Sequence, residues 1–212
     1  MRAVIFTGGE CATGVRIPHH ELCVAADSGF IMAKKLGVFP DLIVGDFDSI
    51  GDSMPVEYID AATGRMSEII RHPAQKNETD TMLAAYIAIE RGAAELYIIG
   101  GLSGRADHTL SNVFLLEALS DRGISVIYTD GANELRVIRD GEAVHIPHGE
   151  YRYFSTLALD ECVISAEGCA YPLDRSTLTR ADAYAVSNET LACGATVTCH
   201  EGKLLLIRSE KL

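Results

Sequence analysis

Short apolar runs alternate with helical patterns over the first 130 residues, and this alternation is the feature that most limits the possible folds. The runs lie at residues 3–6, 22–25, 42–44, 68–70, 96–99 and 126–128. Continuous apolar runs are typical of parallel strands that are covered on both faces. Helical periodicity closed by a glycine appears at residues 28–36, 81–91 and 107–122. We therefore expect residues 1–130 to form an α/β domain with a doubly wound, mainly parallel sheet.

The pattern changes after residue 130, where helical periodicity disappears. Short segments with alternating apolar residues follow one another across turn residues, at 134–137, 143–146, 151–157, 162–166, 183–186, 195–199 and 204–207. Strands at this spacing are typical of a β-sandwich or a small barrel. We expect residues 131–212 to form a smaller all-β domain, with the boundary near residues 129–134.

Charge and apolar content exclude several classes of partner. Thirty acidic residues against eighteen basic ones give a formal charge of −12, which repels nucleic acid and anionic lipid surfaces. No apolar stretch approaches the roughly 20 residues that a membrane-spanning helix needs. The six cysteines form no C-x-x-C pair and have no zinc-like spacing, so free thiols in a reducing compartment are expected. The sequence predicts a cytoplasmic protein without nucleic-acid or membrane partners.

Acidic residues follow the predicted strands or begin the predicted helices. Asp27 follows the second strand, Asp46 and Asp48 follow the third, and Asp80 and Asp107 lie at helix starts. Ligands of an open α/β sheet bind beyond the carboxyl ends of its strands, so we expect these side chains to converge there. Carboxylates at this spacing suit Mg²⁺. Helix capping is the alternative for Asp80 and Asp107, and a turn is the alternative for Asp46 with Asp48.

A glycine-rich loop follows the fifth predicted strand. Gly100, Gly101 and Gly104 would let backbone N–H groups approach an anion at the start of a helix. Arg105 adds a cation with bidentate geometry, and Lys76 is a candidate for another. The chain contains neither a Walker A motif nor the Rossmann G-x-G-x-x-G motif. Together with the acidic residues, the loop indicates metal-dependent chemistry on phosphates.

Four motifs, in this order and at these intervals, resemble the signature of the thiamine pyrophosphokinase family: ADSG, PDLIVGDFDS, KNETDT and GGLSGRADHTLSN. The second predicted domain is similar to the β-rich domain of that family at residues 168–173 and 187–188. The resemblance implies Mg²⁺-dependent transfer of the diphosphate group of ATP to the hydroxyl of thiamine, which yields thiamine diphosphate and AMP. It also implies a homodimer with the thiamine site near the subunit interface.

The resemblance also implies roles for individual residues. The residues that would act on the transferring phosphates are Asp27, Asp46, Asp48, Asp80, Arg105 and Asp107, with Mg²⁺ held by Asp46, Asp48 and Asp80. The nucleotide would be bound by Lys76, Asn77, Thr79, Gly100, Gly101, Gly104, Arg105 and Asn112. Thiamine would be contacted by Ser165, Tyr171, Ser187 and Asn188, with its cationic, flat ring system stacked on Tyr171.

The residues leave several alternatives open. Asp27 or Asp107 is a candidate to accept the hydroxyl proton, or the acid only orients Arg105 or a metal-bound water. The family usually has Asp at position 77 and a Leu-Lys pair at positions 169 and 170, so this chain departs from it near the metal and near thiamine. A Mg²⁺-dependent hydrolase of nucleotides or phosphoesters, a pyrophosphokinase for a different alcohol and a non-catalytic binding module are the rival functions.

Overall fold

The computed structural model describes residues 1–47, 57–73 and 78–210. The chain divides into two compact units, Met1–Gly131 and Ala132–Leu212. Among the described residues, no helix is both long and apolar enough to cross a membrane. All six cysteines are free thiols, as predicted.

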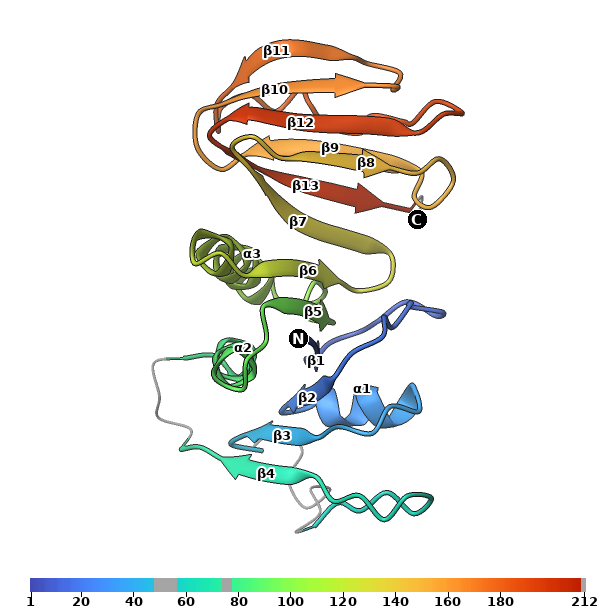
Figure 1. Ribbon diagram of the computed structural model, residues 1–212, viewed down its shortest axis with the longest axis vertical. Coiled ribbons are helices and arrows are strands. Elements are labelled where there is room, and N and C mark those ends of the chain that lie inside the picture. Colours follow the sequence, from blue (N-terminus) through green and yellow to red (C-terminus); the bar gives the residue numbers. More distant parts are fainter. Residues whose placement is uncertain (48–56, 74–77, 211–212) are drawn as a thin grey trace. The chain divides into compact units, whose positions relative to one another are not determined.

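The first unit contains a parallel sheet with the strand order β4-β3-β2-β1-β5-β6 (Figure 1). Its strands are β1 (Arg2–Phe6), β2 (Leu22–Ala26), β3 (Leu42–Gly45), β4 (Glu68–Arg71), β5 (Glu95–Ile99) and β6 (Ser125–Thr129). The central strands are almost wholly buried, since β2 and β3 expose none of their residues substantially. The predicted apolar runs therefore form the middle layer of this unit, as expected for a sheet covered on both faces.

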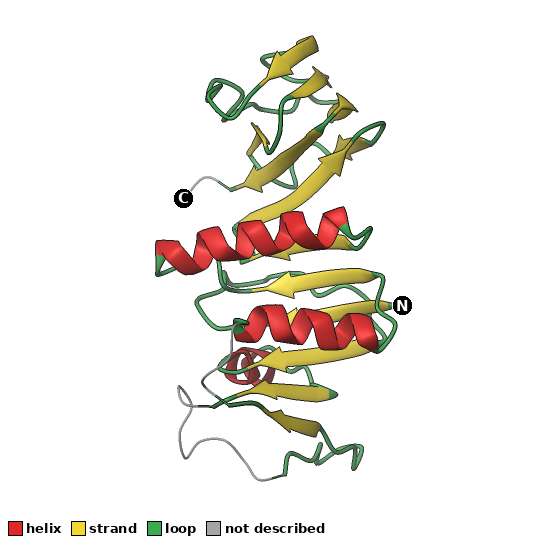
Figure 2. Ribbon diagram, turned by 90° about the vertical axis from the view of Figure 1, so that its left-hand side faces the viewer, coloured by secondary structure: helices red, strands yellow, loops and turns green. Residues whose placement is uncertain are grey.

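Helices cover both faces of this sheet, with α1 (Gly29–Lys35) on one face and α2 (Asp80–Glu90) and α3 (Ala106–Asp121) on the other (Figures 1 and 2). Each helix ends just before a glycine with positive φ, namely Gly37, Gly92 and Gly123. Glycine adopts this conformation without a Cβ clash, which explains why the helices stop there. The prediction of a doubly wound α/β unit is confirmed.

The second unit is a sandwich of two antiparallel sheets. One sheet has the order β7-β13-β9 and the other β11-β10-β12-β8. The strands are β7 (Asn133–Arg139), β8 (Ala143–Ile146), β9 (Tyr153–Ala158), β10 (Cys162–Glu167), β11 (Leu173–Leu178), β12 (Ala195–Glu201) and β13 (Lys203–Ser209). Its core joins residues of both sheets, such as Ile138 and Leu206 of the first with Ile164 and Val197 of the second. The predicted all-β unit is thus confirmed as a sandwich.

Two details of the second unit differ from the prediction. Residues 183–186 are not a strand, because the backbone there is irregular and Ser187 adopts a φ of 57°. The strand β11 was not predicted, because its residues between Leu173 and Leu178 are polar or charged. Within the part of the chain that the structure describes it pairs only with β10, so it lies at the edge of its sheet, where one apolar face is not required.

A partly buried ion-pair network in the second unit leads to a stability prediction. Arg208, whose side chain is 14% exposed, pairs with Glu134, which is 8% exposed, and donates a 3.1 Å hydrogen bond to Glu150. Arg208→Met would leave a buried carboxylate without its cation, so we expect the free energy of unfolding in urea to fall by about 3 kcal/mol. Arg175→Met, which removes an exposed 3.9 Å pair, is the control and should cost less than about 1 kcal/mol. Equal effects of the two substitutions would contradict the prediction.

Candidate active site

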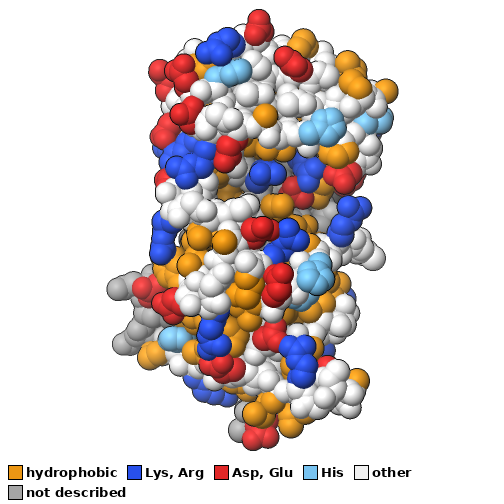
Figure 3. Space-filling model, viewed as in Figure 1, with side chains coloured by type: hydrophobic (Ala, Val, Ile, Leu, Met, Phe, Trp, Pro, Cys, Tyr) orange, Lys and Arg blue, Asp and Glu red, His pale blue; other side chains and the backbone are white. Residues whose placement is uncertain are grey.

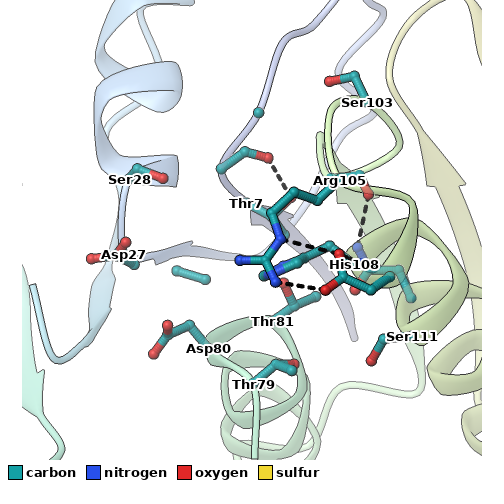
Figure 4. A pocket seen from close by; sticks show the side chains of 16 residues that line it. Thr7, Asp27, Ser28, Thr79, Asp80, Thr81, Ser103, Arg105, His108 and Ser111 are labelled. Carbon is teal, nitrogen blue, oxygen red and sulfur yellow. Dashed lines mark hydrogen bonds and ion pairs between the residues drawn. The ribbon is translucent and has the colours of Figure 1, made fainter. Parts of the chain in front are cut away.

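A cavity of about 620 Å³ lies at the carboxyl-terminal edge of the parallel sheet in the first unit (Figure 4). It is lined by residues 7–9 after β1, 26–28 at the end of β2, 79–81 at the start of α2 and several residues between 101 and 112 after β5. A cavity of this size is ample for a small-molecule ligand. The predicted site residues that line it are Asp27, Thr79, Asp80, Gly101, Arg105, Asp107 and Asn112.

Other predicted residues of this unit lie elsewhere or outside the described chain. Asp46 directly follows β3, and it is not among the described residues that line the cavity. Gly100 and Gly104 flank lining residues without lining the cavity themselves. Asp48, Lys76 and Asn77 lie outside the described residues.

The two glycines that follow β5 have their amide groups committed to the protein. The N–H of Gly100 donates to the carbonyl of Thr129 at 2.8 Å, and the N–H of Gly101 donates to the carbonyl of Gly8 at 2.8 Å. These amides therefore hold the loops after β1, β5 and β6 together, which differs from the predicted donation to an anion. The glycines are needed for close approach, because a Cβ on Gly100 would lie 2.9 Å from the carbonyl oxygen of Thr7.

Buried polar side chains support the Gly101 turn from below. Asn112, 6% exposed, donates from Nδ2 to the carbonyl oxygen of Gly101 at 2.8 Å. Thr7 donates from its hydroxyl to the carbonyl of Ile99 at 3.2 Å. Burial raises the pKa of the Tyr128 hydroxyl, so this group stays neutral beneath the turn. The predicted nucleotide residue Asn112 thus shapes the floor of the cavity.

Gly101→Ala should test this floor, since a Cβ there would lie 2.7 Å from the Tyr128 hydroxyl and 2.8 Å from Nδ2 of Asn112. The φ of Gly101 is also positive, at 66°. We expect a loss of about 2–4 kcal/mol in the free energy of unfolding, measured by denaturant titration. Gly104→Ala is the matched control: its φ is 87°, but no atom lies within 4 Å of the added Cβ, so only about 1 kcal/mol should be lost. A smaller loss for Gly101→Ala than for Gly104→Ala would refute the steric argument.

Acidic side chains outnumber basic ones in the cavity. Of the described lining residues, Asp27, Asp80 and Asp107 are acidic and Arg105 is the basic one, apart from His108. In Figure 4, Asp27 and Asp80 lie on the same side of the Arg105 guanidinium. An anionic phosphate compound would be repelled by this excess of carboxylates unless a cation accompanied it.

The donor set fits Mg²⁺ bound together with a phosphate ligand. Mg²⁺ in such sites usually takes one or two carboxylates and completes its shell with water and phosphate oxygens. Asp27 and Asp80 supply two carboxylates, while the described residues contain no group of three acidic, histidine or cysteine side chains gathered around one point. Thr79 also has a local role, because its hydroxyl accepts a 3.2 Å hydrogen bond from the amide of Met82 and caps α2.

Arg105 and Asp107 form a bidentate pair at the start of α3. The Arg105 Nε donates to Oδ1 of Asp107 at 3.1 Å, and its Nη2 donates to Oδ2 at 2.6 Å. The amide of His108 donates to Oδ1 as well, at 3.0 Å. The hydrogen bond from Arg105 lowers the pKa of Asp107, and the same contact raises the pKa of Arg105. Asp107 is therefore ionised and engaged, which favours the reading in which it orients Arg105.

The predicted thiamine residues of the second unit differ in their surroundings. The Ser165 hydroxyl lies 2.8 Å from Nε2 of His200 and accepts a 3.0 Å hydrogen bond from the amide of Arg175. Tyr171 is 70% exposed, whereas Asn188 is buried and bonded to the Tyr171 backbone. The amide of Ser187 donates to the hydroxyl of Ser155 at 3.0 Å.

Comparison with known proteins follows the division into two units. Residues 16–128 match the model of the thiamin pyrophosphokinase catalytic domain, and residues 142–204 match that of the thiamin pyrophosphokinase vitamin B1 binding domain. Thiamine pyrophosphokinase of Bacillus subtilis (strain 168) is 29% identical over 192 residues, covering 90% of this chain and 88% of that protein.

Solved structures agree with these matches. A crystal structure of thiamine pyrophosphokinase from Bacillus subtilis superposes with a TM-score of 0.82 over the whole of both chains, at 25% identity. Thiamin pyrophosphokinase from Candida albicans gives a TM-score of 0.76 at 15% identity, covering 99% of this chain and 89% of that one. The latter likeness concerns the fold alone.

Proposed function

Because the chain belongs to the thiamin pyrophosphokinase family, we propose that it transfers the diphosphate group of ATP to the hydroxyl of thiamine, giving thiamine diphosphate and AMP. The observation that carries the proposal is the cavity at the carboxyl-terminal edge of the parallel sheet. Most of its lining falls within the match to the catalytic-domain model, and it combines carboxylates with an oriented arginine. This combination suits a phosphate donor that arrives with a divalent cation.

Arg105 supplies fixed positive charge in the proposed reaction. Transfer of a diphosphate group depends on positioning and on neutralising charge at the phosphate oxygens, and it requires little covalent chemistry from the protein. The two hydrogen bonds to Asp107 favour one orientation of the guanidinium plane before the substrate binds. Asn112 and Gly101 shape the floor against which the phosphates would lie.

Carboxylates of the first unit would hold Mg²⁺. Asp27 and Asp80 are assigned this role because they line the cavity, and Asp46 retains it from the family motif. When bound, Mg²⁺ supplies neutralising charge for the phosphate oxygens. Asp107 accepts three hydrogen bonds, two from Arg105 and one from the His108 amide, and is assigned to orienting Arg105, whereas Asp27 stays a candidate to accept the proton of the thiamine hydroxyl.

The second unit would bind thiamine, since it contains the match to the vitamin B1 binding domain. Thiamine is a cation with a flat pyrimidine, and the exposed ring of Tyr171 offers a stacking face for it.

We also propose a homodimer with the thiamine site near the subunit interface, and a cytoplasmic location. On the face drawn in Figure 3, acidic and basic side chains are interspersed, which does not favour a polyanionic partner there.

Incubation with Mg-ATP, with and without thiamine, tests the proposed function. Chromatography should detect AMP and thiamine diphosphate together, and only when both substrates are present. ADP, or breakdown of ATP that does not depend on thiamine, would overturn the proposal and favour a hydrolase. If thiamine is not converted but another alcohol, supplied in its place, is pyrophosphorylated with release of AMP, the acceptor was misassigned.

A further inference from the structure

The side chain of Asn188 is hydrogen-bonded to the protein through both its oxygen and its nitrogen. Its Oδ1 accepts hydrogen bonds from the amides of Tyr171 and Glu189, both at 3.0 Å, and its Nδ2 donates to the Tyr171 carbonyl at 2.8 Å. Burial raises the pKa of the neighbouring Cys169 thiol, and Asn188 lowers that pKa by a smaller amount. The hydrogen bonds with the backbone of Tyr171 and Glu189 use three of the four acceptor and donor positions of the amide side chain, including both acceptor positions.

The backbone of Asn188 is tied to the core of the sandwich. Its amide donates to the carbonyl of Phe154 at 2.8 Å, and its carbonyl accepts from the Phe154 amide at 2.9 Å. Phe154 belongs to β9 and is 2% exposed. The residue before Tyr171 and the residue after Asn188 are paired as well, since the amide of Ala170 donates a 2.9 Å hydrogen bond to the carbonyl oxygen of Glu189. A continuous set of hydrogen bonds thus runs from a buried strand to the backbone of Tyr171.

Tyr171 combines a fixed backbone with an exposed ring. Its amide donates to the side chain of Asn188 and its carbonyl accepts from that side chain, which fixes both of its peptide groups, and Pro172 restricts its backbone to extended conformations. The ring nevertheless remains 70% exposed. A ring on a backbone fixed in this way can receive a flat ligand without further ordering of the backbone, so only the rotamer freedom of the side chain is lost on binding.

We infer that Asn188 is a positioning residue that acts on the acceptor substrate through Tyr171 and does not itself touch that substrate. This inference rests on the proposed function, because it takes thiamine to be the flat cation that Tyr171 receives. It replaces direct contact, the role expected for Asn188 from the family motif, with the role that its hydrogen bonds support.

We call the two hydrogen bonds between the Asn188 side chain and the Tyr171 backbone the clamp. Asn188→Ala removes the clamp and should raise the KM for thiamine about tenfold, because the Tyr171 backbone is no longer held. The KM for ATP and kcat should stay within about twofold. Asn188→Asp keeps the two acceptor positions but replaces the donor with a charged oxygen that faces the Tyr171 carbonyl oxygen, so it should raise the KM for thiamine as well. Asp182→Ala is the matched control: it removes a side chain that accepts 2.8 and 2.7 Å hydrogen bonds from Thr179, and it should leave the KM for thiamine unchanged.

The same substitutions in a Tyr171→Ala background separate positioning from contact. If Asn188 acts through Tyr171, adding Asn188→Ala to Tyr171→Ala should change the KM for thiamine less than twofold. Multiplication of the two single effects would show that Asn188 acts independently of Tyr171 and would overturn the inference. So would equal increases in the KM values for ATP and thiamine, which indicate a general structural defect.

Hydrogen exchange supplies a readout that does not depend on activity. Peptides containing the Tyr171 amide should exchange faster in Asn188→Ala than in the wild type, whereas peptides of the first unit should not change. An unchanged exchange rate of the Tyr171 amide would overturn the inference that Asn188 holds Tyr171, even if the KM for thiamine changed. If the wild type forms no thiamine diphosphate, the proposed function fails and the inference falls with it. A wild type that is active, with an unaltered KM for thiamine in Asn188→Ala, overturns the inference alone.

Discussion

Arg105→Ala is expected to lower kcat for AMP formation about 10³-fold, because it removes a fixed cation from the proposed phosphate site. The melting temperature without ligand should change little, since the Arg105 side chain is 74% exposed and its ion pair with Asp107 lies at the surface. Arg105→Lys should recover only part of the rate, because an ammonium group retains the charge but cannot make the bidentate contact. The check is the steady-state rate of AMP release, measured for the wild type, Arg105→Ala and Arg105→Lys.

Arg91→Ala is the control for this experiment. Arg91 also makes a two-point contact, with both carboxylate oxygens of Glu68 at 2.9 Å, but it lies outside the cavity lining. It should leave kcat within about twofold. Wild-type kcat in Arg105→Ala, or an equal loss in Arg91→Ala, would remove Arg105 from the proposed mechanism.

The Arg105–Asp107 pair also has a defined pH dependence. Asp107 has a lowered pKa, chiefly because of the hydrogen bond from Arg105. A carboxylate with a lowered pKa in the folded protein adds to the stability of the fold at pH values above its ordinary pKa of about 3.9. This added stability is lost as the pH falls through the lowered pKa. An acid limb of kcat at near-neutral pH would therefore have to arise from another group.

The sequence predicted those elements whose burial leaves a regular apolar pattern. Strands β2 and β3 are apolar throughout, because both faces of the parallel sheet are covered. Residues 183–186 resembled a strand because Tyr184 and Val186 alternate with smaller residues, yet both side chains are exposed in the structure. An edge strand such as β11 needs no apolar face, so its polar sequence gave no signal.

The site was predictable to the extent that topology determines it. Asp27, Asp80 and Arg105 were expected at one edge because the ends of parallel strands and the starts of the following helices must meet there. The hydrogen bonds that Asn112 donates to Gly101 and Asn188 donates to Tyr171 depend on which loops approach each other and on side-chain rotamers. A linear sequence contains no periodic signal for such contacts. The same reason explains why Thr7 and Tyr128, which lie under the glycine turn, were missed.

Asp80→Asn is expected to lower kcat/KM for Mg-ATP about 10²-fold or more and to raise the Mg²⁺ concentration needed for half-maximal rate. Asparagine keeps the shape of the side chain and an oxygen donor but removes the charge that would hold the cation. The first turn of α2 should lose only about 0.3–1 kcal/mol from the weaker interaction with the helix dipole. AMP formation measured across a Mg²⁺ titration reports both effects.

Glu90→Gln removes the same charge from the other end of α2 and is the matched control, with unchanged Mg²⁺ dependence expected. Thermal melting supplies a second readout, because a ligand that binds only the folded protein stabilises it. Mg-ATP should raise the melting temperature of the wild type and of Glu90→Gln more than that of Asp80→Asn. A normal Mg²⁺ titration in Asp80→Asn would exclude it as a metal ligand. A large fall in the melting temperature of the ligand-free variant would instead mean that Asp80 serves the fold of α2, as a helix-start carboxylate can do without any metal.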